Sequence, residues 1–303
     1  MSTPAARLPV EMLEPRRLLT SSLSAGGTLS VIGSNFYDNV IIAKSTVDPT
    51  DLLVTEKRKG LPAVVTVYPT AGVKSIVVQL NNGDDQFIID DTFGGVLTVP
   101  RTIDGGAGND LISGGRGDDT IFGGLGNDTL SGRQGNDSVS AGDGNDVVSG
   151  GTGNDTVNGD ADHDTLYGDD ADDSMTGGTG ADYIHAGLGD DTCFGNAGND
   201  SLEGCSGDDD LFGGADNDVI DGLFGSDDIF GEGGDDILTG NFLNQGPDEP
   251  GDVDTLTGGA GNDDFDPNDN AEVADRTSAD NGRNSYVPTF ASVVAIVNAR
   301  NFQ

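Results

Sequence analysis

A nine-residue repeat occupies the middle of the chain and constrains its fold more than any other feature. From Gly105 the sequence reads GGAGNDLIS, GGRGDDTIF and GGLGNDTLS, and the frame holds without a slip to Thr239, which makes 15 consecutive units. The sixth residue is Asp and the eighth is apolar in all fifteen units, while the first is Gly in thirteen and the fourth is Gly in twelve. A fixed period held over this distance indicates a solenoid, in which each unit stacks on its neighbours.

Each unit divides into two parts that favour different backbone conformations. The six residues GGxGxD form turns, because Gly adopts positive φ at no steric cost and Asp is a turn residue. The other three residues, with the apolar one in the centre, suit a short strand whose middle side chain faces one way. Two strands and two turns close one coil. We therefore predict an all-β fold, a parallel β-roll, which is a right-handed β-solenoid with two short strands per 18-residue coil.

The apolar eighth residues alternate between two predicted sheets and point into the space between them. One face of this core is predicted to consist of Ile112, Leu130, Val148, Leu166, Ile184, Leu202, Ile220 and Leu238. The opposite face is predicted to consist of Ile121, Val139, Val157, Met175, Cys193, Leu211 and Ile229. One apolar side chain per nine residues is a sparse core, which does not by itself offset the conformational entropy lost on ordering the chain.

The Asp residues place a large negative charge along the stacked coils. The chain has 53 acidic and 14 basic residues, a net charge of −39, and 46 of the acids are Asp. Stacked coils lie about 4.8 Å apart, and like charges at this separation repel by about 3 kcal/mol at an effective dielectric constant of about 20. A divalent cation that binds oxygen removes this repulsion, and Ca²⁺ fits best because it takes many oxygen ligands in flexible geometry. The same charge argues against nucleic acid as a partner, because phosphates are repelled.

The unit GGxGxDxUx, where U is apolar, resembles the RTX, or haemolysin-type, calcium-binding nonapeptide repeat family. The resemblance implies a β-roll that binds several Ca²⁺ ions between coils, through sixth-position carboxylates and backbone carbonyls of the glycine-rich turns. The sequence departs from the family pattern at Asp162, Ala171 and Asp216, where the fourth glycine is missing. Carried over position by position, the implied carboxylate ligands are Asp110, Asp119, Asp128, Asp137, Asp146, Asp155, Asp164, Asp173, Asp182, Asp191, Asp200, Asp209, Asp218, Asp227, Asp236, Asp254 and Asp263.

The repeat is interrupted once and then resumes, so we predict a roll over residues 105–266. Residues 240–257 span two periods, and the second half still has Asp254 and Leu256 in the sixth and eighth positions. The first half has Gln245 where Asp is expected, which predicts an insertion at 240–251 that leaves the roll as a loop.

The flanking regions differ from the repeat. Residues 29–104 contain short apolar runs and are predicted to be a β-rich N-terminal cap, either irregular solenoid coils or a small sandwich. The run NNGDDQFII, which begins at residue 81, has Asp85 and Phe87 in positions equivalent to those of the repeat, although it is out of frame with it. The seven strands are expected at 29–32, 39–43, 51–55, 63–68, 75–80, 86–90 and 96–99. Residues 267–303 are predicted to cap the other end, with a covering strand at 292–298.

The termini suggest export from a bacterial cell. Residues 1–28 are predicted to be a poorly ordered export or targeting segment, since LEPRRLL at 13–19 resembles the LEPR-xLL segment of large bacterial surface or secreted proteins. RTX proteins generally leave the cell by type I secretion, which implies a C-terminal signal within 267–303. The sequence contains no run of 18 apolar residues, so we expect no transmembrane helix. The expected location is extracellular, either secreted or associated with the cell surface.

Searches for catalytic motifs found none. The chain lacks HExxH, G-x-S-x-G and a P-loop, and we therefore predict that it is not an enzyme. His163 and His185 fall in outward positions without a partner at metal-site spacing, and both are expected to be surface residues. Cys193 falls in an inward position and Cys205 in a turn, so no disulfide is expected between them.

The function indicated is calcium binding by a secreted or cell-surface protein that folds as it binds, in a structural or adhesive role. Its partners would be calcium ions and a polysaccharide or protein of the cell surface or matrix. One alternative is a secreted calcium-dependent enzyme that acts on polysaccharide through residues 29–104. Another is a calcium-dependent module released from a larger toxin.

Overall fold

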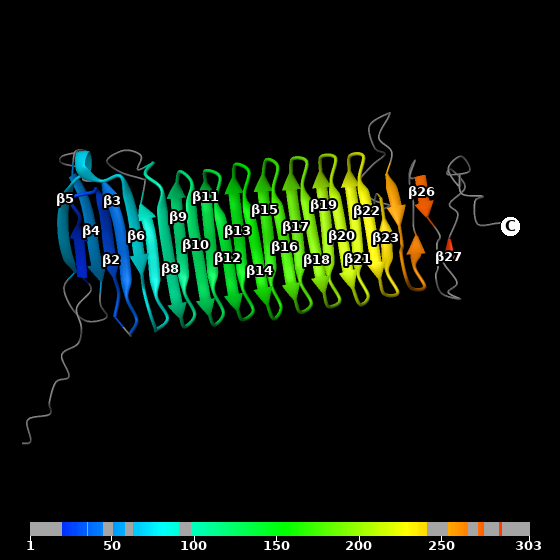
Figure 1. The fold of residues 1–303 in the computed structure, drawn as a ribbon, viewed down its shortest axis with the longest axis horizontal. Coiled ribbons are helices and arrows are strands. Elements are labelled where there is room, and N and C mark those ends of the chain that lie inside the picture. Colours follow the sequence, from blue (N-terminus) through cyan, green and yellow to red (C-terminus); the bar gives the residue numbers. More distant parts are fainter. Residues whose placement is uncertain are drawn as a thin grey trace, which may run out of the picture.

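The computed structural model describes residues 20–34, 36–44, 51–57, 63–90, 98–240 and 254–265, together with the strand residues 272–275 and 285–286. These residues form two long sheets that run side by side along an elongated molecule (Figure 1). In spatial order, sheet A contains β1 (Thr20–Leu23), β2 (Thr28–Ile32), β6 (Ser75–Gln79), β8 (Arg101–Ala107), β10 (Asp119–Leu125), β12 (Ser138–Asp143), β14 (Thr156–Ala161), β16 (Ser174–Thr179), β18 (Thr192–Ala197), β20 (Asp210–Ala215), β22 (Asp228–Gly233), β24 (Thr255–Thr257) and β26 (Glu272–Asp275).

Sheet B contains the remaining strands, which alternate along the chain with those of sheet A from β6 onward. In spatial order they are β27 (Ser285–Tyr286), β25 (Asp264–Phe265), β23 (Ile237–Thr239), β21 (Val219–Phe224), β19 (Ser201–Ser206), β17 (Tyr183–Leu188), β15 (Thr165–Asp170), β13 (Val147–Thr152), β11 (Thr129–Gln134), β9 (Leu111–Arg116), β7 (Gln86–Asp90), β3 (Asn39–Lys44), β4 (Asp51–Lys57) and β5 (Val64–Pro69). The one helix in the described part of the chain is the 3₁₀ turn η1 (Thr70–Gly72). Within the same residues, no helix is long and apolar enough to cross a membrane.

Strand pairing confirms the predicted 18-residue coil. In sheet A, Ile121 of β10 pairs with Val139 of β12, and in sheet B, Leu130 of β11 pairs with Val148 of β13, both in parallel register. The fold is therefore an all-β solenoid of parallel, stacked coils, as the repeat predicts. All fifteen apolar eighth residues are at most 2% exposed and belong to one continuous core between the sheets.

The strands are longer than the sequence pattern predicts, and the prediction of three-residue strands is wrong. Strands β11 to β22 each have six residues, because they continue through the first three residues of the following unit. In β11, for example, Arg133 and Gln134 still pair with Gly151 and Thr152 of β13. Each coil gives the turn residues of the next coil a hydrogen-bonding partner, so only positions four to six form the turn.

The residues that replace the fourth glycine keep a positive φ. Asp162, Ala171 and Asp216 have φ values of 75°, 84° and 77°, in the left-handed region that the glycines of this position also occupy or approach. The backbone N–H of Ala171 still donates to the carbonyl of Leu188 at 2.6 Å, as Gly135 does to Thr152 at 2.9 Å. These substitutions cost backbone strain and retain the turn.

The N-terminal strands extend both sheets of the roll. β6 pairs in parallel with β8, and β7 pairs in parallel with β9, which places Phe87 opposite Ile112. β2 and β3 continue the parallel pairing, with β6 and β7 respectively, and beyond them the pairing is antiparallel, between β1 and β2 and in the series β3, β4 and β5. This arrangement agrees with the irregular-coil alternative. Of the seven strands expected here, six are found; of the seventh, at 96–99, residues 96 and 97 lie outside the described residues, and residues 98 and 99 are not in a strand.

At the C-terminal end the coil length changes once. β24 follows β22 in sheet A and β25 follows β23 in sheet B, with Ile229 opposite Leu256 and Leu238 opposite Phe265. Each of these pairs is 27 residues apart, which is one coil plus one nonapeptide. Residues 241–253, which include most of the predicted insertion, lie outside the described residues, as do residues 1–19 and the predicted strand at 292–298.

Candidate metal sites

The sixth-position Asp residues form two straight ladders, one along each side of the roll. We call the series that precedes sheet A strands the A ladder, and the series that precedes sheet B strands the B ladder. Every carboxylate is at most 3% exposed. The A ladder comprises Asp119, Asp137, Asp155, Asp173, Asp191, Asp209, Asp227 and Asp254. The B ladder comprises Asp110, Asp128, Asp146, Asp164, Asp182, Asp200, Asp218, Asp236 and Asp263.

One carboxylate oxygen of each ladder residue holds neighbouring coils together. The backbone N–H of Asp146 donates to Oδ1 of Asp164 at 2.8 Å, and the N–H of Asp164 donates to Oδ1 of Asp182 at 2.8 Å. The same bond recurs along both ladders at 2.6–3.2 Å. The Oδ1 atoms are therefore hydrogen-bond acceptors that link the backbones of neighbouring coils.

The second oxygen, Oδ2, has no protein partner along most of the two ladders. Buried polar atoms are normally hydrogen-bonded, so a repeated exception requires an explanation. In the two ladders, buried and unpaired Oδ2 atoms belong to Asp110, Asp128, Asp137, Asp146, Asp155, Asp164, Asp173, Asp182, Asp191, Asp200, Asp209, Asp218, Asp227 and Asp236.

Backbone carbonyls converge on the same spaces as these unpaired oxygens. A Cβ atom placed on Gly195 would stand 2.5 Å from Oδ2 of Asp200 and 2.5 Å from the carbonyl oxygen of Gly213 in the next coil. A Cβ on Gly105 would likewise stand 2.6 Å from Oδ2 of Asp110 and 2.6 Å from the carbonyl oxygen of Gly123. A first-position glycine thus leaves room for a carboxylate and a carbonyl from adjacent coils to approach one another.

Burial makes the metal-free ladders resist ionisation. Desolvation is the largest cause in every case, and the charges of neighbouring ladder residues commonly add to it, whereas the backbone N–H bonds oppose it. The pKa is raised to about 6 for Asp137, Asp146, Asp191, Asp200 and Asp236, to about 7 for Asp119, Asp128, Asp155, Asp164, Asp209 and Asp218, and to about 8 for Asp173 and Asp227. The pKa values of Asp110 and Asp182 are also raised.

A cation from the protein itself occupies the first step of the A ladder. Arg101 lies one coil before Asp119, in the position that Asp takes elsewhere, and its side chain is fully buried. Its Nη1 donates to both carboxylate oxygens of Asp119 at 2.9 Å and to the carbonyl oxygen of Arg116 at 3.0 Å. A positive group here contacts Oδ2 of the ladder carboxylate, the atom that has no hydrogen-bond partner at the steps from Asp137 to Asp227 of the A ladder. The guanidinium therefore marks where a cation fits.

The B ladder extends further toward the N-terminus than the regular repeat. The N–H of Asp85 donates to Oδ1 of Asp110 at 2.7 Å, and the N–H of Asp38 donates to Oδ1 of Asp85 at 2.5 Å. Sequence reasoning noted Asp85 but missed Asp38 and Arg101. The available signal for Asp38 was GSNFYDNVI at 33–41, which has Asp in position six and an apolar residue in position eight without the later glycines.

The residues present fit Ca²⁺. Each ladder step offers carboxylate and carbonyl oxygens and no nitrogen or sulfur ligand, which is the donor set that Ca²⁺ prefers over softer metals. One divalent cation between coils would bind the unpaired Oδ2 atoms and the nearby carbonyl oxygens. Its positive charge would also stabilise the ionised carboxylates, whose pKa values burial otherwise raises.

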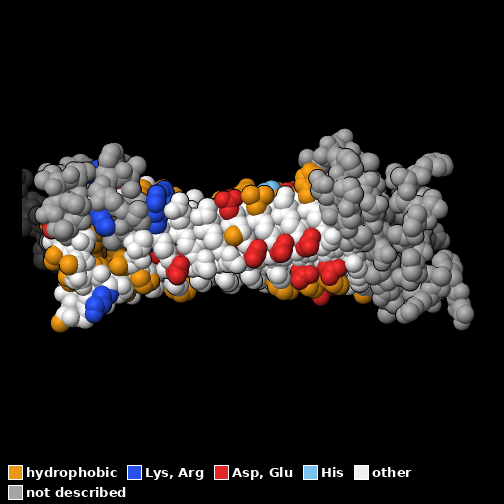
Figure 2. All heavy atoms as spheres, turned by 90° about the horizontal axis from the view of Figure 1, so that it is seen from above, with side chains coloured by type: hydrophobic (Ala, Val, Ile, Leu, Met, Phe, Trp, Pro, Cys, Tyr) orange, Lys and Arg blue, Asp and Glu red, His pale blue; other side chains and the backbone are white. Residues whose placement is uncertain are grey.

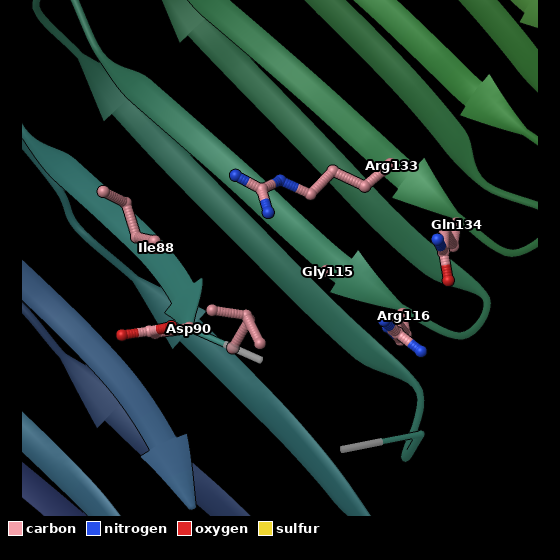
Figure 3. Close-up of a pocket in the computed structure, with 7 residues that line it drawn as sticks. Ile88, Asp90, Gly115, Arg116, Arg133 and Gln134 are labelled. Atoms are coloured by element: carbon pink, nitrogen blue, oxygen red, sulfur yellow. The ribbon is translucent and has the colours of Figure 1, made fainter. Parts of the chain in front are cut away.

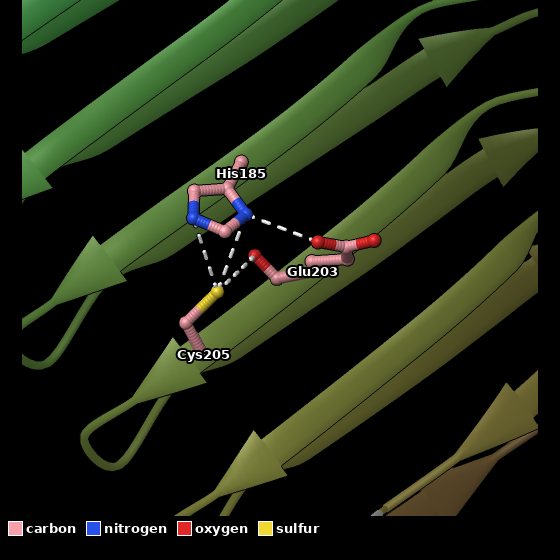
Figure 4. Close-up of side chains that lie close together, drawn as sticks. All are labelled: His185, Glu203 and Cys205. Atoms are coloured by element: carbon pink, nitrogen blue, oxygen red, sulfur yellow. Dashed lines mark hydrogen bonds and ion pairs between the residues drawn. The ribbon is translucent and has the colours of Figure 1, made fainter. Parts of the chain in front are cut away.

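A different cluster corrects the expectation for His185. Its Nδ1 lies 3.0 Å from Oε2 of Glu203, and Sγ of Cys205 lies 3.4 Å from the same Nδ1 (Figure 4). The prediction that His185 has no partner at metal spacing is therefore wrong, because stacking brings together residues 18 and 20 apart in sequence. His163 is exposed, and its Nδ1 accepts the backbone N–H of Ala181 at 2.6 Å.

Both cysteines are free thiols. Cys193 is fully buried in the core, as its inward position predicts, and Cys205 is half-buried in β19. Burial, with the nearby Glu203 carboxylate, raises the pKa of the Cys205 thiol to about 12. Without a metal this thiol is protonated and a poor nucleophile.

The outer surface is charged unevenly. Figure 2 shows Asp and Glu side chains gathered over the middle and C-terminal part of the described roll, with Lys and Arg near its N-terminal third. Beside β7, β9 and β11 lies a pocket of about 420 Å³ (Figure 3). Its lining consists of Ile88, Ile89, Asp90, Gly115, Arg116, Arg133 and Gln134.

Comparison with known proteins agrees with the ladder geometry. The profile of the RTX calcium-binding nonapeptide repeat, in a form containing four copies, matches residues 102–130, 131–166, 167–202, 204–238 and 251–269. These segments make up just over half of the chain. No match was found among curated proteins. The coil length, the Asp ladders and the matched segments together establish that the chain belongs to the RTX calcium-binding repeat family.

Proposed function

We propose that the roll binds a row of Ca²⁺ ions between its coils and that this binding drives its folding. The observation that carries the proposal is the series of buried Oδ2 atoms that face carbonyl oxygens and have no protein partner. Folding without a cation buries these carboxylates beside one another, which is unfavourable. Folding with Ca²⁺ converts the same oxygens into ligands.

The ladders set the number of sites available. Asp110 to Asp263 in the B ladder make eight stacked pairs, and Asp119 to Asp254 in the A ladder make seven. We propose that each pair supplies carboxylate oxygens to one Ca²⁺, with turn carbonyls completing its coordination. The proposed ligands are the seventeen sixth-position Asp residues named from the sequence. Arg101 replaces the ion at the step before Asp119.

Calcium-dependent folding suits a protein that works outside the cell. Extracellular modules typically bind Ca²⁺ with dissociation constants of about 10⁻⁴–10⁻³ M, so the roll would fill outside the cell and stay empty in the cytosol. An empty chain with net charge −39 would be an extended polyanion. Repeats of this family are typical of secreted bacterial proteins. We therefore propose a secreted or cell-surface protein with a structural or adhesive role toward a surface polysaccharide or protein.

A second candidate function is a calcium-dependent enzyme that acts on polysaccharide. The pocket between β7 and β11 favours it, because Asp90 stands there with two exposed guanidinium groups, Arg116 and Arg133, that could bind sugar carboxylates. The full-length protein in millimolar Ca²⁺ should be assayed for cleavage of acidic polysaccharides. Turnover that is lost in Asp90→Asn would favour the enzyme over the structural role.

The test of the main proposal is a calcium titration of the full-length protein. Far-UV circular dichroism should change from coil in chelator to β-rich in millimolar Ca²⁺, and calorimetry should count more than ten ions per chain, since fifteen stacked pairs are available. Mg²⁺ at the same concentration should not reproduce the change, because it prefers a smaller octahedral site. A spectrum that is β-rich in chelator and unchanged by Ca²⁺ would contradict the proposal.

A further inference from the structure

The cluster of His185, Glu203 and Cys205 on β17 and β19 brings three kinds of metal ligand together. Nδ1 of His185 lies 3.0 Å from Oε2 of Glu203, while Sγ of Cys205 lies 3.4 Å from Nδ1 and 3.5 Å from Nε2. One ligand atom from each side chain can be chosen so that all three lie within 4.8 Å of one another. In Figure 4 the three side chains point toward a common space beside the two strands.

These distances suit a tetrahedral ion. Zn–N, Zn–O and Zn–S bonds of about 2.0–2.3 Å place neighbouring ligand atoms of a tetrahedron about 3.5 Å apart. The N–O separation of 3.0 Å and the N–S separation of 3.4 Å are close to this value, and the carboxylate oxygen and the sulfur lie within 4.8 Å of one another. The imidazole and thiolate donors favour Zn²⁺ over Ca²⁺, whereas the ladders offer only oxygen. We propose that His185, Glu203 and Cys205 bind a single Zn²⁺ ion with one coordination position open, at a site chemically distinct from the calcium ladders.

The position of Cys205 in the repeat allows its thiol to be removed by a conservative change, since six other units also have a non-glycine residue of positive φ there. Cys205 stands in the second position of its unit, where Gly is the commonest residue, and its φ is 84°. A residue with a Cβ is disfavoured in this conformation, and such strain persists where the side chain or the surroundings compensate for it. Gly at this position would relieve the strain without changing the path of the backbone.

Neighbouring side chains hold the proposed ligands in place. The Tyr183 hydroxyl donates to Oε2 of Glu203 at 2.8 Å, and the Tyr167 ring lies edge-on to the His185 ring with centroids 5.9 Å apart. Outer contacts of this kind orient metal ligands and raise affinity. Tyr167, His185 and Glu203 stand in register on three successive strands of sheet B, so the orientation is built into the stack of coils.

A further carboxylate stands beside the cluster. Asp221 of β21 is in register with Glu203, and its Oδ1 is buried without a hydrogen-bond partner among the described residues. Two neighbouring carboxylates, one of them incompletely paired, are stabilised by a cation between or beside them. Asp221 is therefore placed one strand from Glu203, where its carboxylate can accept a hydrogen bond from a water on the open position of the ion.

The test uses full-length protein folded in saturating Ca²⁺, with Co²⁺ as a spectroscopic probe and Zn²⁺ as competitor. One equivalent of Co²⁺ should give a thiolate-to-cobalt charge-transfer band, and Zn²⁺ should abolish it. Cys205→Gly should lose the band while its thermal stability stays equal or rises, because the substitution restores the glycine of the repeat. Glu203→Gln and His185→Gln should each weaken Zn²⁺ binding at least ten-fold.

Matched controls separate this site from the rest of the chain. His163→Gln removes the other histidine and should leave Zn²⁺ affinity unchanged. Far-UV circular dichroism of the same samples reports calcium-driven folding, so failure of the zinc site and failure of the calcium proposal are distinguished. A folded protein without the charge-transfer band, or Zn²⁺ affinity that is unchanged in Cys205→Gly, would overturn the proposed zinc site.

Discussion

Replacing Asp173 by Asn gives the sharpest test of the ladders, because a matched control lies next to it. Asp173 accepts the N–H of Asp155 at 2.7 Å and is buried, whereas Asp172 accepts the N–H of Asp190 at 3.1 Å and is exposed. Asn keeps an oxygen that can accept these bonds. Asp173→Asn and Asp172→Asn therefore make the same chemical change, and only the first removes a carboxylate from a ladder.

With Ca²⁺ present, Asp173→Asn should lose bound ions. Asp173 is shared by the pairs with Asp155 and Asp191, so one or two ions per chain should be missing. Each bound ion contributes about 1.4 kcal/mol of stability for every ten-fold rise in free Ca²⁺ above its dissociation constant. The free energy of unfolding should therefore rise by about 1.4–2.8 kcal/mol less per ten-fold step in Asp173→Asn than in the wild type.

Without Ca²⁺ the effect should reverse in sign. Burial raises the pKa of Asp173 to about 8, with Asp155 and Asp191 adding to it, so folding at pH 7 requires this carboxylate to take up a proton, at a cost of at most about 4 kcal/mol relative to the ionised unfolded chain. Solvent outside the turns screens part of this free-energy cost. We therefore expect Asp173→Asn to stabilise the folded coils by about 2 kcal/mol in the absence of Ca²⁺.

The assay is urea unfolding followed by circular dichroism at several Ca²⁺ concentrations, with calorimetry for the number of ions. The curves of stability against Ca²⁺ for Asp173→Asn and the wild type should cross, while Asp172→Asn follows the wild type. Equal ion counts and equal calcium dependence for Asp173→Asn and the wild type would refute the assignment of the ladder carboxylates as ligands.

Three further perturbations test other parts of the structure. Arg101→Asp should destabilise the N-terminal coils by about 3–5 kcal/mol in chelator, since it removes the partner of buried Asp119. In Ca²⁺ the same variant should bind one more ion per chain by calorimetry. No added ion would count against the proposal that the Arg101 guanidinium takes the place of a Ca²⁺ ion. In chelator, acidification from about pH 8 to pH 5 should increase the β-structure measured by circular dichroism. Burial raises the pKa values of the ladder carboxyls to about 6–8, so the folded ladders bind protons that the unfolded chain releases, and stability is lost as pH rises through this range. No increase would mean that burial does not disfavour the charged ladders. Leu202→Ala should lower the free energy of unfolding in Ca²⁺ by about 2–5 kcal/mol, because Leu202 is buried in the core. Amide hydrogen exchange should become faster in the adjacent coils but not in β10 or β12. A uniform loss of protection would contradict the one-dimensional behaviour of a solenoid.

The main architecture was predictable because a fixed period leaves little freedom. Once Asp and an apolar residue recur every nine positions, an 18-residue coil determines which residues stack, and Ile121 falls opposite Val139 as expected. The burial of the Asp ladders follows from the same stacking. The length of the strands did not follow, because residue types alone suggested that both glycines belong to the turn. Hydrogen bonds from the adjacent coil keep them in the strands.

The ends of the ladders were harder to predict, because there the coil length changes. Asp85 and Asp110 are 25 residues apart and Asp227 and Asp254 are 27 apart, so a fixed count of 18 misses both contacts. Arg101 is in frame with the A ladder but has the opposite charge. A search for acidic residues passes over it, although a cation is the natural partner for Asp119.

Contacts on the outer face arise, like the ladders, because successive coils stack one coil length apart. A search for metal ligands at short sequence spacings does not detect them. His185 and Glu203 are both ninth residues of their units, 18 apart, and Cys205 is the second residue of the unit that follows Glu203. The bond from Ser140 to Asp160 joins the same two positions as the contact between His185 and Cys205, so a separation of 20 is a general neighbour relation on this surface. Metal-binding spacings derived from helices and hairpins do not include 18 or 20. In a solenoid of this coil length, ligand searches therefore have to compare residues one coil apart, and the outward positions have to be searched as carefully as the repeated Asp.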